Sequence, residues 1–402
     1  MKLHTYFFTG ILLFTGFLSF AQTTTTYGSG AGTNGDRNSF FGYQAGKITT
    51  GSRNVFVGNE TGIKNTTGKY NVMIGDRAGY VNTTGYMNTF LGTLSGYRNT
   101  TATYNTMLGA FTGHYNTTGQ RNTLIGSFAG YRNTTSYGVM VGDRAGYANT
   151  TGYMNTFIGT LSGYQNTTGG YNTTTGAYSG FSNTTGRYNT FFGFQSGFYN
   201  TTASYNTSIG MYAGRSSKTG SNNTFLGSYA GYRLVSGTGN VFLGRQAGYN
   251  ELGSNKLYID NSTTTTPLLY GDFSSNQLGV NTNNIPAGYA FAVKGKVITE
   301  EVKIQTYATW PDFVFYKDYN LPTLKEVEAH IKEKGHLQDI PSAKDVKENG
   351  IFLGEMNAKL LQKIEELMLY TLAQEKKLTH QEKEITTLKE QFIQLEKKIK
   401  NN

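Results

Sequence analysis

Tyrosine and arginine residues recur at a fixed spacing through the first part of this 402-residue chain. The tyrosines each follow a glycine, and arginine comes next in three cases: Tyr80, Tyr97–Arg98, Tyr131–Arg132, Tyr147, Tyr164, Tyr232–Arg233 and Tyr249. Rings and guanidinium groups in a regular row can bind sugars or anionic polymers. The candidate ligand-binding residues are therefore Tyr97, Arg98, Tyr131, Arg132, Tyr164, Tyr232 and Arg233. The alternative is an aromatic ladder that only stiffens the fold.

Other residue types that carry chemistry are too sparse to form a site. His114 is the one histidine within the repeats, and His330, His336 and His380 lie on or beside polar segments. We find no paired carboxylates, zinc-ligand spacing, phosphate-binding loop or nucleophile elbow. A calcium ladder would need an acid in every turn, and the chain lacks cysteine. The expectation is a protein with no catalytic activity, cofactor, metal or small-molecule substrate.

The net charge of +10 is unevenly distributed. Residues 27–250 contain 15 Lys and Arg against four acidic residues, and the chain from residue 251 onward is slightly acidic. A positive field favours anionic partners such as acidic polysaccharide, lipopolysaccharide or nucleic acid. The same charge could serve only to keep a glycine-rich rod in solution, because a field alone identifies no partner.

The tyrosines belong to a repeat that must position them. Thirteen copies of the consensus N-[TV]-[FM]-[LIV]-G-x-x-[AS]-G-[YF]-x-N-T-T-G-x-[YM] run from Asn38 to about Asn250, with a step of 17 residues except for two of 16. So short a period predicts a parallel β-roll or solenoid in which each coil buries its face on the next. The β-branched and aromatic triplets, such as 89–91, predict one short strand per coil.

Alternation along each strand places its residues on two faces. We expect Thr89 and Leu91 to fill the inside of the coil and Phe90 to lie on the outside. Phe or Met recurs at the Phe90 position, and an exposed apolar stripe of this length generally marks an interface. This reasoning predicts a homotrimer packed around an axis.

An Asn-Thr-Thr triplet occurs in nine consecutive copies, from Asn65 to Asn200. These triplets have the form of N-glycosylation acceptors. Asparagine also favours turns, so the alternative is a ladder in which each Asn bonds the backbone of its neighbour.

The units "NTFLGxxAGYxNTTG" resemble the head repeats of YadA-type trimeric adhesins, over residues 27–250. That resemblance implies a left-handed parallel β-roll, three chains around one axis, and adhesion to surfaces. The repeat here is a few residues longer than in that family, and the chain ends in a helix rather than in the family's β-barrel anchor.

The first 21 residues, with Lys2 before an apolar run and small residues at Ser19 and Ala21, predict a secretory signal peptide. No other stretch reaches the roughly 18 apolar residues of a membrane helix, so we expect no membrane span in the mature chain. The expected location is outside the cell or on the surface of a Gram-negative bacterium.

Beyond Asn250 the repeat stops. Residues 251–309 predict a β-rich neck, and residues 310–350 a small helical module with a capping box at Thr323 and Glu326 and a stop at Gly335. Residues 351–402 carry apolar residues at alternating steps of three and four, from Leu360 to Ile399. This heptad pattern predicts a coiled coil that holds the trimer together, although heptads alone also allow two strands.

Residues 258–369 resemble the C-terminal module of tail-fibre-like surface proteins common in Bacteroidetes, a likeness that says nothing about activity. The sequence as a whole predicts a secreted structural or adhesive fibre that binds surfaces, polysaccharide or a matrix protein. One alternative is a receptor-binding tail fibre of a phage or injection machine, against which the signal peptide argues. Another is an ice-binding solenoid, suggested by the Thr pairs, although Thr alternates with Phe in each strand.

Overall fold

A computed structural model describes residues 24–305 and 310–400. The predicted signal peptide, residues 1–21, lies outside these ranges. The chain divides into two compact units, one ending at Val297 and the other beginning at Ile298. We describe each unit by itself.

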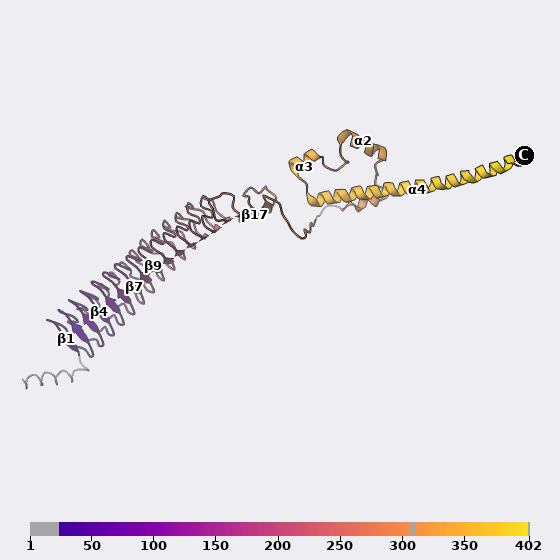
Figure 1. Cartoon of the computed structure of the whole chain (residues 1–402). Coiled ribbons are helices and arrows are strands. Elements are labelled where there is room, and N and C mark those ends of the chain that lie inside the picture. Colours follow the sequence, from indigo (N-terminus) through magenta and orange to yellow (C-terminus); the bar gives the residue numbers. More distant parts are fainter. Residues whose placement is uncertain (1–23, 306–309, 401–402) are drawn as a thin grey trace, which may run out of the picture. The chain divides into compact units, whose positions relative to one another are not determined.

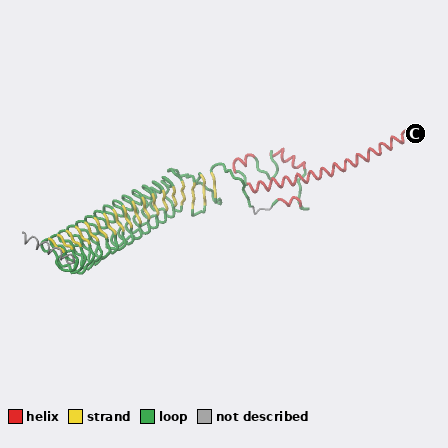
Figure 2. Tube along the Cα trace, turned by 60° about the horizontal axis from the view of Figure 1, so that its bottom comes forward, coloured by secondary structure: helices red, strands yellow, loops and turns green. Residues whose placement is uncertain are grey.

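The N-terminal unit is a β-solenoid, mainly β as predicted, with one three-residue strand in each repeat (Figure 1). The strands of the repeats are β1 (Thr25–Tyr27), β2 (Ser39–Phe41), β3 (Val55–Val57), β4 (Val72–Ile74), β5 (Thr89–Leu91), β6 (Thr106–Leu108), β7 (Thr123–Ile125), β8 (Val139–Val141), β9 (Thr156–Ile158), β10 (Thr173–Thr175), β11 (Thr190–Phe192), β12 (Thr207–Ile209), β13 (Thr224–Leu226) and β14 (Val241–Leu243). They line up on one side of the coils, and turns form the rest of each coil (Figure 2).

Each strand pairs in parallel with the next one in sequence, and the register follows the repeat. Thr89, Phe90 and Leu91 pair with Thr106, Met107 and Leu108, so equivalent positions form straight columns along the solenoid. The coils extend beyond the thirteen copies seen in the sequence. Strand β1 adds a coil before them, and β15 (Lys256–Ile259), which we expected in the neck, continues the parallel ladder after β14.

The prediction of the strand faces is wrong. In β2 to β14 the middle residue of each strand points into the coil: Phe90 is completely buried, whereas Leu91 is 40% exposed and Thr89 is also exposed. The reason lies in the preceding asparagine. Asn88 must be inside the coil because its amide bonds the neighbouring coils, and alternation then turns Phe90 inward as well. The predicted outer stripe of Phe and Met therefore does not exist, and the trimer argument built on it falls.

The two glycines of each repeat have distinct steric roles. Gly92 has φ of +135°, and a Cβ there would lie 2.5 Å from the carbonyl oxygen of Gly109 in the next coil. Gly96 has φ of +58°, and a Cβ there would lie 2.7 Å from the ring of Phe90. The first glycine thus permits the close stacking of coils, and the second makes room for the large inward side chain.

Two ladders of buried asparagines line the polar interior, and most of their side chains are hydrogen-bonded, although those of Asn99 and Asn200 have no partner among the described residues. The side-chain oxygen of Asn71 accepts from the backbone N–H of Asn88 at 3.0 Å, and Asn88 Nδ2 donates to the carbonyl oxygen of Ala102 at 2.8 Å. In the Asn-Thr-Thr ladder, Asn82 Nδ2 donates to Asn65 Oδ1 at 2.8 Å. These Asn side chains are buried in a ladder of turns, as the turn interpretation expects, but each bonds the neighbouring Asn side chain or the backbone of its own turn, as Asn82 does with Gly85 at 3.1 Å, and not the neighbour's backbone.

The apolar core is interrupted near β10 and β12. The inward column is filled mainly by Phe, Met and Leu, but it holds Thr174 in β10 and Ser208 in β12. One cluster of buried apolar residues ends at Phe157, and the next begins at Ala213. Ser208 Oγ has no hydrogen-bond partner among the described residues, whereas Thr174 Oγ1 lies 2.5 Å from Ser162 Oγ.

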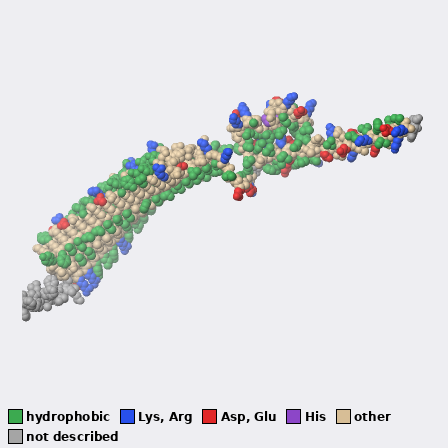
Figure 3. Space-filling view, viewed as in Figure 1, with side chains coloured by type: hydrophobic (Ala, Val, Ile, Leu, Met, Phe, Trp, Pro, Cys, Tyr) green, Lys and Arg blue, Asp and Glu red, His purple; other side chains and the backbone are tan. Residues whose placement is uncertain are grey.

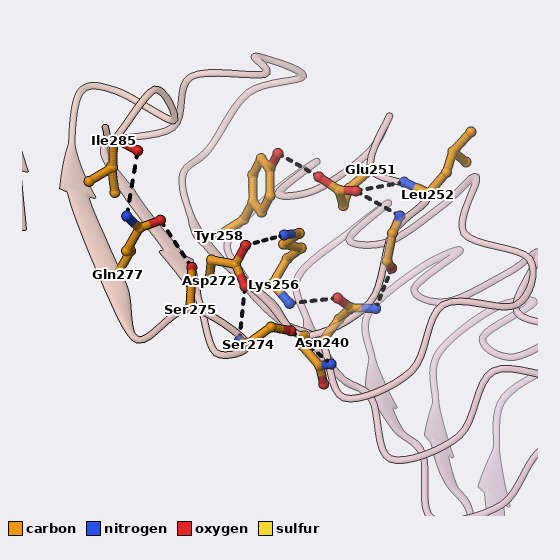
Figure 4. A network of polar contacts seen from close by, with 12 residues as sticks. Asn240, Glu251, Leu252, Lys256, Tyr258, Asp272, Ser274, Ser275, Gln277 and Ile285 are labelled. Atoms are coloured by element: carbon orange, nitrogen blue, oxygen red, sulfur yellow. Dashed lines mark hydrogen bonds and ion pairs between the residues drawn. The ribbon is translucent and has the colours of Figure 1, made fainter. Parts of the chain in front are cut away.

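Three further strands close the end of the solenoid: β16 (Leu269–Asp272), β17 (Gln277–Val280) and β18 (Phe291–Val293). Strands β15, β16 and β17 are antiparallel, so the coil pattern ends here. Lys256 Nζ lies 2.5 Å from Asp272 Oδ2, and Tyr258 donates to Glu251 Oε2 at 2.7 Å (Figure 4). The hydrogen bond and charge of Lys256 lower the pKa of Asp272.

The C-terminal unit contains a 3-10 helix, η1 (Pro311–Phe315), and three α-helices, α2 (Leu324–Lys334), α3 (Ala343–Asn349) and α4 (Leu353–Lys400). The predicted capping box of Thr323 and Glu326 is present, and Gly335 ends α2 in a left-handed conformation. Tyr319 donates to the buried Glu366 at 2.5 Å and fixes the segment after η1 on α4. Burial and that bond raise the pKa of Tyr319 to about 12.

Candidate functional site

The predicted tyrosines lie in one stacked column, which we call the tyrosine ladder. Its members are Tyr80, Tyr97, His114, Tyr131, Tyr147, Tyr164, Phe181, Phe198, Arg215, Tyr232 and Tyr249. Neighbouring rings are stacked with centroids 5.0 to 5.3 Å apart. Arg215 takes the place of a ring, 5.5 Å from the centroid of Phe198 and 5.6 Å from that of Tyr232.

The tyrosine ladder is half-buried, and this burial shifts the pKa values of two of its ionisable groups. Burial lowers the pKa of His114, which lies between Tyr97 and Tyr131, and burial raises the pKa of Tyr131. Between the end residues Tyr80 and Tyr249, each ring has both faces covered by its neighbours in the column, so a ligand reaches only the ring edges there. This geometry suits a ladder that stiffens the coils.

The predicted arginines lie in the adjacent column and are exposed. The guanidinium of Arg98 lies 4.7 Å from the centroid of Tyr115, the next residue in that column, and Arg132 follows one coil later. Arg233 donates to Asn250 Oδ1 at 3.2 Å. The structure thus brings Tyr97, Arg98, Tyr131, Arg132 and Tyr164 together on one side of five consecutive coils. Tyr232 and Arg233 share these columns several coils further along.

A second row of aromatic residues was missed by the sequence reasoning. We call it the corner column, because it forms the turn directly before each Asn and strand: Arg53, Tyr70, Met87, Tyr104, Arg121, Tyr137, Met154, Tyr171, Tyr188 and Tyr205. Nine of these ten residues are exposed, and all have left-handed φ values between 55° and 63°. The recurring Tyr or Met at the end of the consensus was the available signal. The sequence pattern alone does not reveal that this position is an exposed corner.

The outer face of the strands carries two further columns. The first strand position is mostly Thr or Val, and the third is mostly Leu, Ile, Val or Phe, of which Leu91, Leu108 and Phe192 are 40%, 41% and 57% exposed. An exposed aliphatic stripe therefore does follow the solenoid, but it consists of the third strand residues. Figure 3 shows hydrophobic side chains gathered in bands along this unit. The Thr column is flanked by aliphatic residues and not by a second row of Thr.

The C-terminal unit has an apolar groove of about 430 Å³ between α2 and α4. Leu324, Val327, Leu360, Ile364 and Leu367 are among its lining residues. Three of them belong to the predicted heptad pattern. The apolar heptad residues along α4 are exposed, including Ile385, Leu388 and Phe392, which line a shallow apolar groove further along the helix.

Within residues 24–305 and 310–400, no group of three or more His, Cys, Asp or Glu side chains is placed to hold a metal ion. In the same ranges, no helix combines the length and the apolar character needed to cross a membrane. Comparisons with protein-family models, with curated proteins and with solved structures found no match to this chain.

Proposed function

We propose that this protein is a secreted, homotrimeric adhesive fibre, without catalytic activity, whose solenoid binds surfaces or polysaccharide outside a Gram-negative cell. The observation that carries the proposal is the recurrence of equivalent exposed positions, coil after coil, along the solenoid. Weak contacts repeated at a fixed spacing combine into strong attachment to a repetitive partner, because each further contact becomes intramolecular. Such a surface suits a polymer or a cell surface better than a small molecule.

Two exposed apolar surfaces support assembly from several copies. One is the stripe of third strand residues, such as Leu91 and Leu108, and the other is the heptad face of α4. Exposed apolar surfaces of this extent generally mark interfaces. Heptad residues are normally covered by a partner helix, and Thr371, Gln374 and Gln381 within the pattern would help to set its register and strand number. Three copies is the number that the resemblance to YadA-type adhesins implies.

The charge distribution supports an anionic partner. Positive residues predominate by 15 to four over residues 27–250, and Arg98, Arg132 and Arg233 are exposed beside the tyrosine ladder. A field of one sign along a rod attracts polyanions and speeds their association. Acidic polysaccharide and lipopolysaccharide have this chemistry and are abundant at cell surfaces.

The proposal is tested by measuring the mass of the purified protein and its location on cells. Multi-angle light scattering should give three times the chain mass of 44.1 kDa, less any removed leader. A monomeric mass would overturn the trimer. Antibody labelling of intact cells should find the protein at the surface. Recovery only in phage or injection-machine particles would favour the tail-fibre alternative.

The binding half of the proposal needs a separate screen. The full-length protein should be retained on immobilised acidic glycans or matrix proteins, and its retention should fall as salt is raised. Absence of retention on every surface, at low salt, would contradict an adhesive role even if the protein is a trimer.

A further inference from the structure

We propose that the corner column binds a linear anionic polysaccharide that lies along the solenoid axis. This inference rests on the proposed adhesive function and assigns its binding surface, which differs from the predicted tyrosine ladder. The surface runs from Arg53 to Tyr205 and includes the flanking cations Lys69 and Arg187.

The backbone of the corner column does not require aromatic residues. A left-handed conformation is unfavourable for a large side chain and is tolerated best by Gly and Asn. In the later coils the same corner is occupied by Asn222, Gly239 and Asn255, with φ of 59°, 68° and 59°. Tyr, Met and Arg at the preceding ten corners are therefore not a demand of the fold. Strained residues that the fold does not need are typical of functional surfaces.

Within the corner column, Tyr188 presents the edge of its ring to solvent. Tyr188 lies between Tyr171 and Tyr205, with centroids 4.9 and 5.0 Å away and ring planes inclined by 8° in both pairs. Both of its faces are covered, so a sugar ring or a base has no face to stack on. The edge of an aromatic ring is its electropositive part, and the phenolic O–H is a donor. A row of edges and hydroxyls therefore favours anionic groups.

Cations are held in place along the same column. The guanidinium of Arg121 lies 5.7 Å from the centroid of Tyr104 and 5.6 Å from that of Tyr137, and its Nη1 donates to the Tyr137 hydroxyl at 2.9 Å. Arg53 packs on Tyr70 in the same way, 5.1 Å from its centroid. Side chains fixed before binding lose less entropy when a ligand arrives, which strengthens attachment.

Acidic residues are rare at this corner: Asp36, one coil before the proposed surface, lies in the preceding column and pairs with Arg37 at 3.5 Å. From Ser52 to Tyr205, neither the corner column nor the column directly before it contains Asp or Glu. Glu60, Asp76 and Asp143 lie at the other corner, which follows the strand. Along the near side runs a row of mostly exposed hydroxyls, the second Thr of each Asn-Thr-Thr triplet. Edges, cations and hydroxyls in parallel rows match the carboxylate or sulfate and hydroxyl groups of an acidic polysaccharide.

A polysaccharide fits this surface better than a nucleic acid. Proteins that bind single strands usually offer open ring faces on which bases stack. Both faces of Tyr188, and the faces that Tyr171 and Tyr205 turn toward it, are closed here. The hydroxyl row offers hydrogen bonds that a sugar chain can accept and donate along its whole length.

Affinity electrophoresis of the full-length protein in gels that contain alginate tests the inference. In the first variant, Arg53, Lys69, Arg121 and Arg187 are each replaced by Gln, and we expect the alginate Kd to rise about tenfold or more because four charge contacts are lost. In the second, Tyr171→Asn, Tyr188→Asn and Tyr205→Asn should weaken binding without lowering the melting temperature, since Asn222 shows that Asn fits this corner.

The matched control removes the same charge elsewhere. Arg98, Arg132, Arg233 and Arg245 are replaced by Gln, and alginate binding should fall much less than in the corner variant. An equal or larger loss in the control would overturn the inference in favour of the surface beside the tyrosine ladder. Unchanged binding in both corner variants would overturn it too, and so would displacement of alginate by DNA at a lower charge concentration.

The two proposals fail separately. Attachment to cells or matrix proteins without any retardation by alginate would refute the corner inference and leave the adhesive function standing. No attachment to any surface would refute both.

Discussion

The solenoid and the helix α4 both repeat apolar residues at a fixed spacing, but only the solenoid covers its main apolar column with its own chain. Phe90 is covered by the coils before and after it, whereas Leu388 and Phe392 in α4 are 63% and 64% exposed. In a parallel solenoid the next coil covers each inward apolar residue, whereas the part of α4 that carries Leu388 and Phe392 packs on no other described element. The solenoid should therefore be stable alone, and α4 should depend on other copies.

The largest expected effect is loss of assembly through α4. Replacing Ile385, Leu388 and Phe392 by Ser removes three exposed apolar residues from the heptad pattern, so we expect light scattering to show only monomers. The solenoid melting temperature should not change, because none of these residues belongs to its core.

The matched control for this variant changes the opposite side of α4. Replacing Lys383, Glu390 and Lys397 by Ser alters the same stretch of helix but spares the apolar heptad residues. The mass should then stay that of the trimer. If the Ile385, Leu388 and Phe392 variant also remains a trimer, the solenoid stripe and not α4 holds the copies together.

A smaller effect, on the free energy of unfolding, is expected when two adjacent residues of one strand are each replaced by Ala. Phe90→Ala should reduce the free energy of unfolding by about 3–5 kcal/mol, as for other fully buried aromatic residues. Leu91→Ala, one position further on, should cost well under half as much, since Leu91 is exposed in a single chain. Urea unfolding of both variants, in the background that lacks the α4 heptad residues, gives the two values. Equal losses would contradict the observed strand faces.

The repeat, its period and its parallel stacking could be predicted from the sequence, because each coil repeats the same residues at the same positions. The direction of the strand faces could not be predicted, because in Thr-Phe-Leu either the central Phe or the flanking Thr and Leu could plausibly face the inside of the coil. The choice is made by Asn88, whose hydrogen bonds to Asn71 and Ala102 become visible only in three dimensions.

The candidate site was predictable to a similar degree. The spacing of Tyr97, Tyr131 and Tyr164 correctly placed them in one column, because a fixed period puts equivalent residues above one another. Their half-burial, and the exposure of Tyr188 and Tyr205 at the other row, depend on which residues form the turns. These turns need left-handed φ values that Tyr rarely adopts, so local sequence preferences do not predict a turn at these tyrosines.

The smallest effect is expected where the apolar core of the solenoid is interrupted. A substitution there should stabilise the protein and not destabilise it. Ser208 has its hydroxyl buried without a partner, so Ser208→Leu should raise the free energy of unfolding by about 1–3 kcal/mol through loss of the unpaired group and burial of apolar surface. The equivalent column position accepts Leu124, so the volume is compatible with the coil.

Thr174→Leu is the matched control for this variant. Its hydroxyl is paired with Ser162, so the gain there should be smaller or absent. Urea unfolding compares the two. An equal gain at both positions would mean that apolar surface alone limits this region, and a loss at Ser208 would mean that the polar interruption is needed where the two core clusters meet. Ser208 is thus one of several described residues of the solenoid, with Asn99 and Asn200 among the others, whose buried polar side-chain atoms find no partner in their own chain.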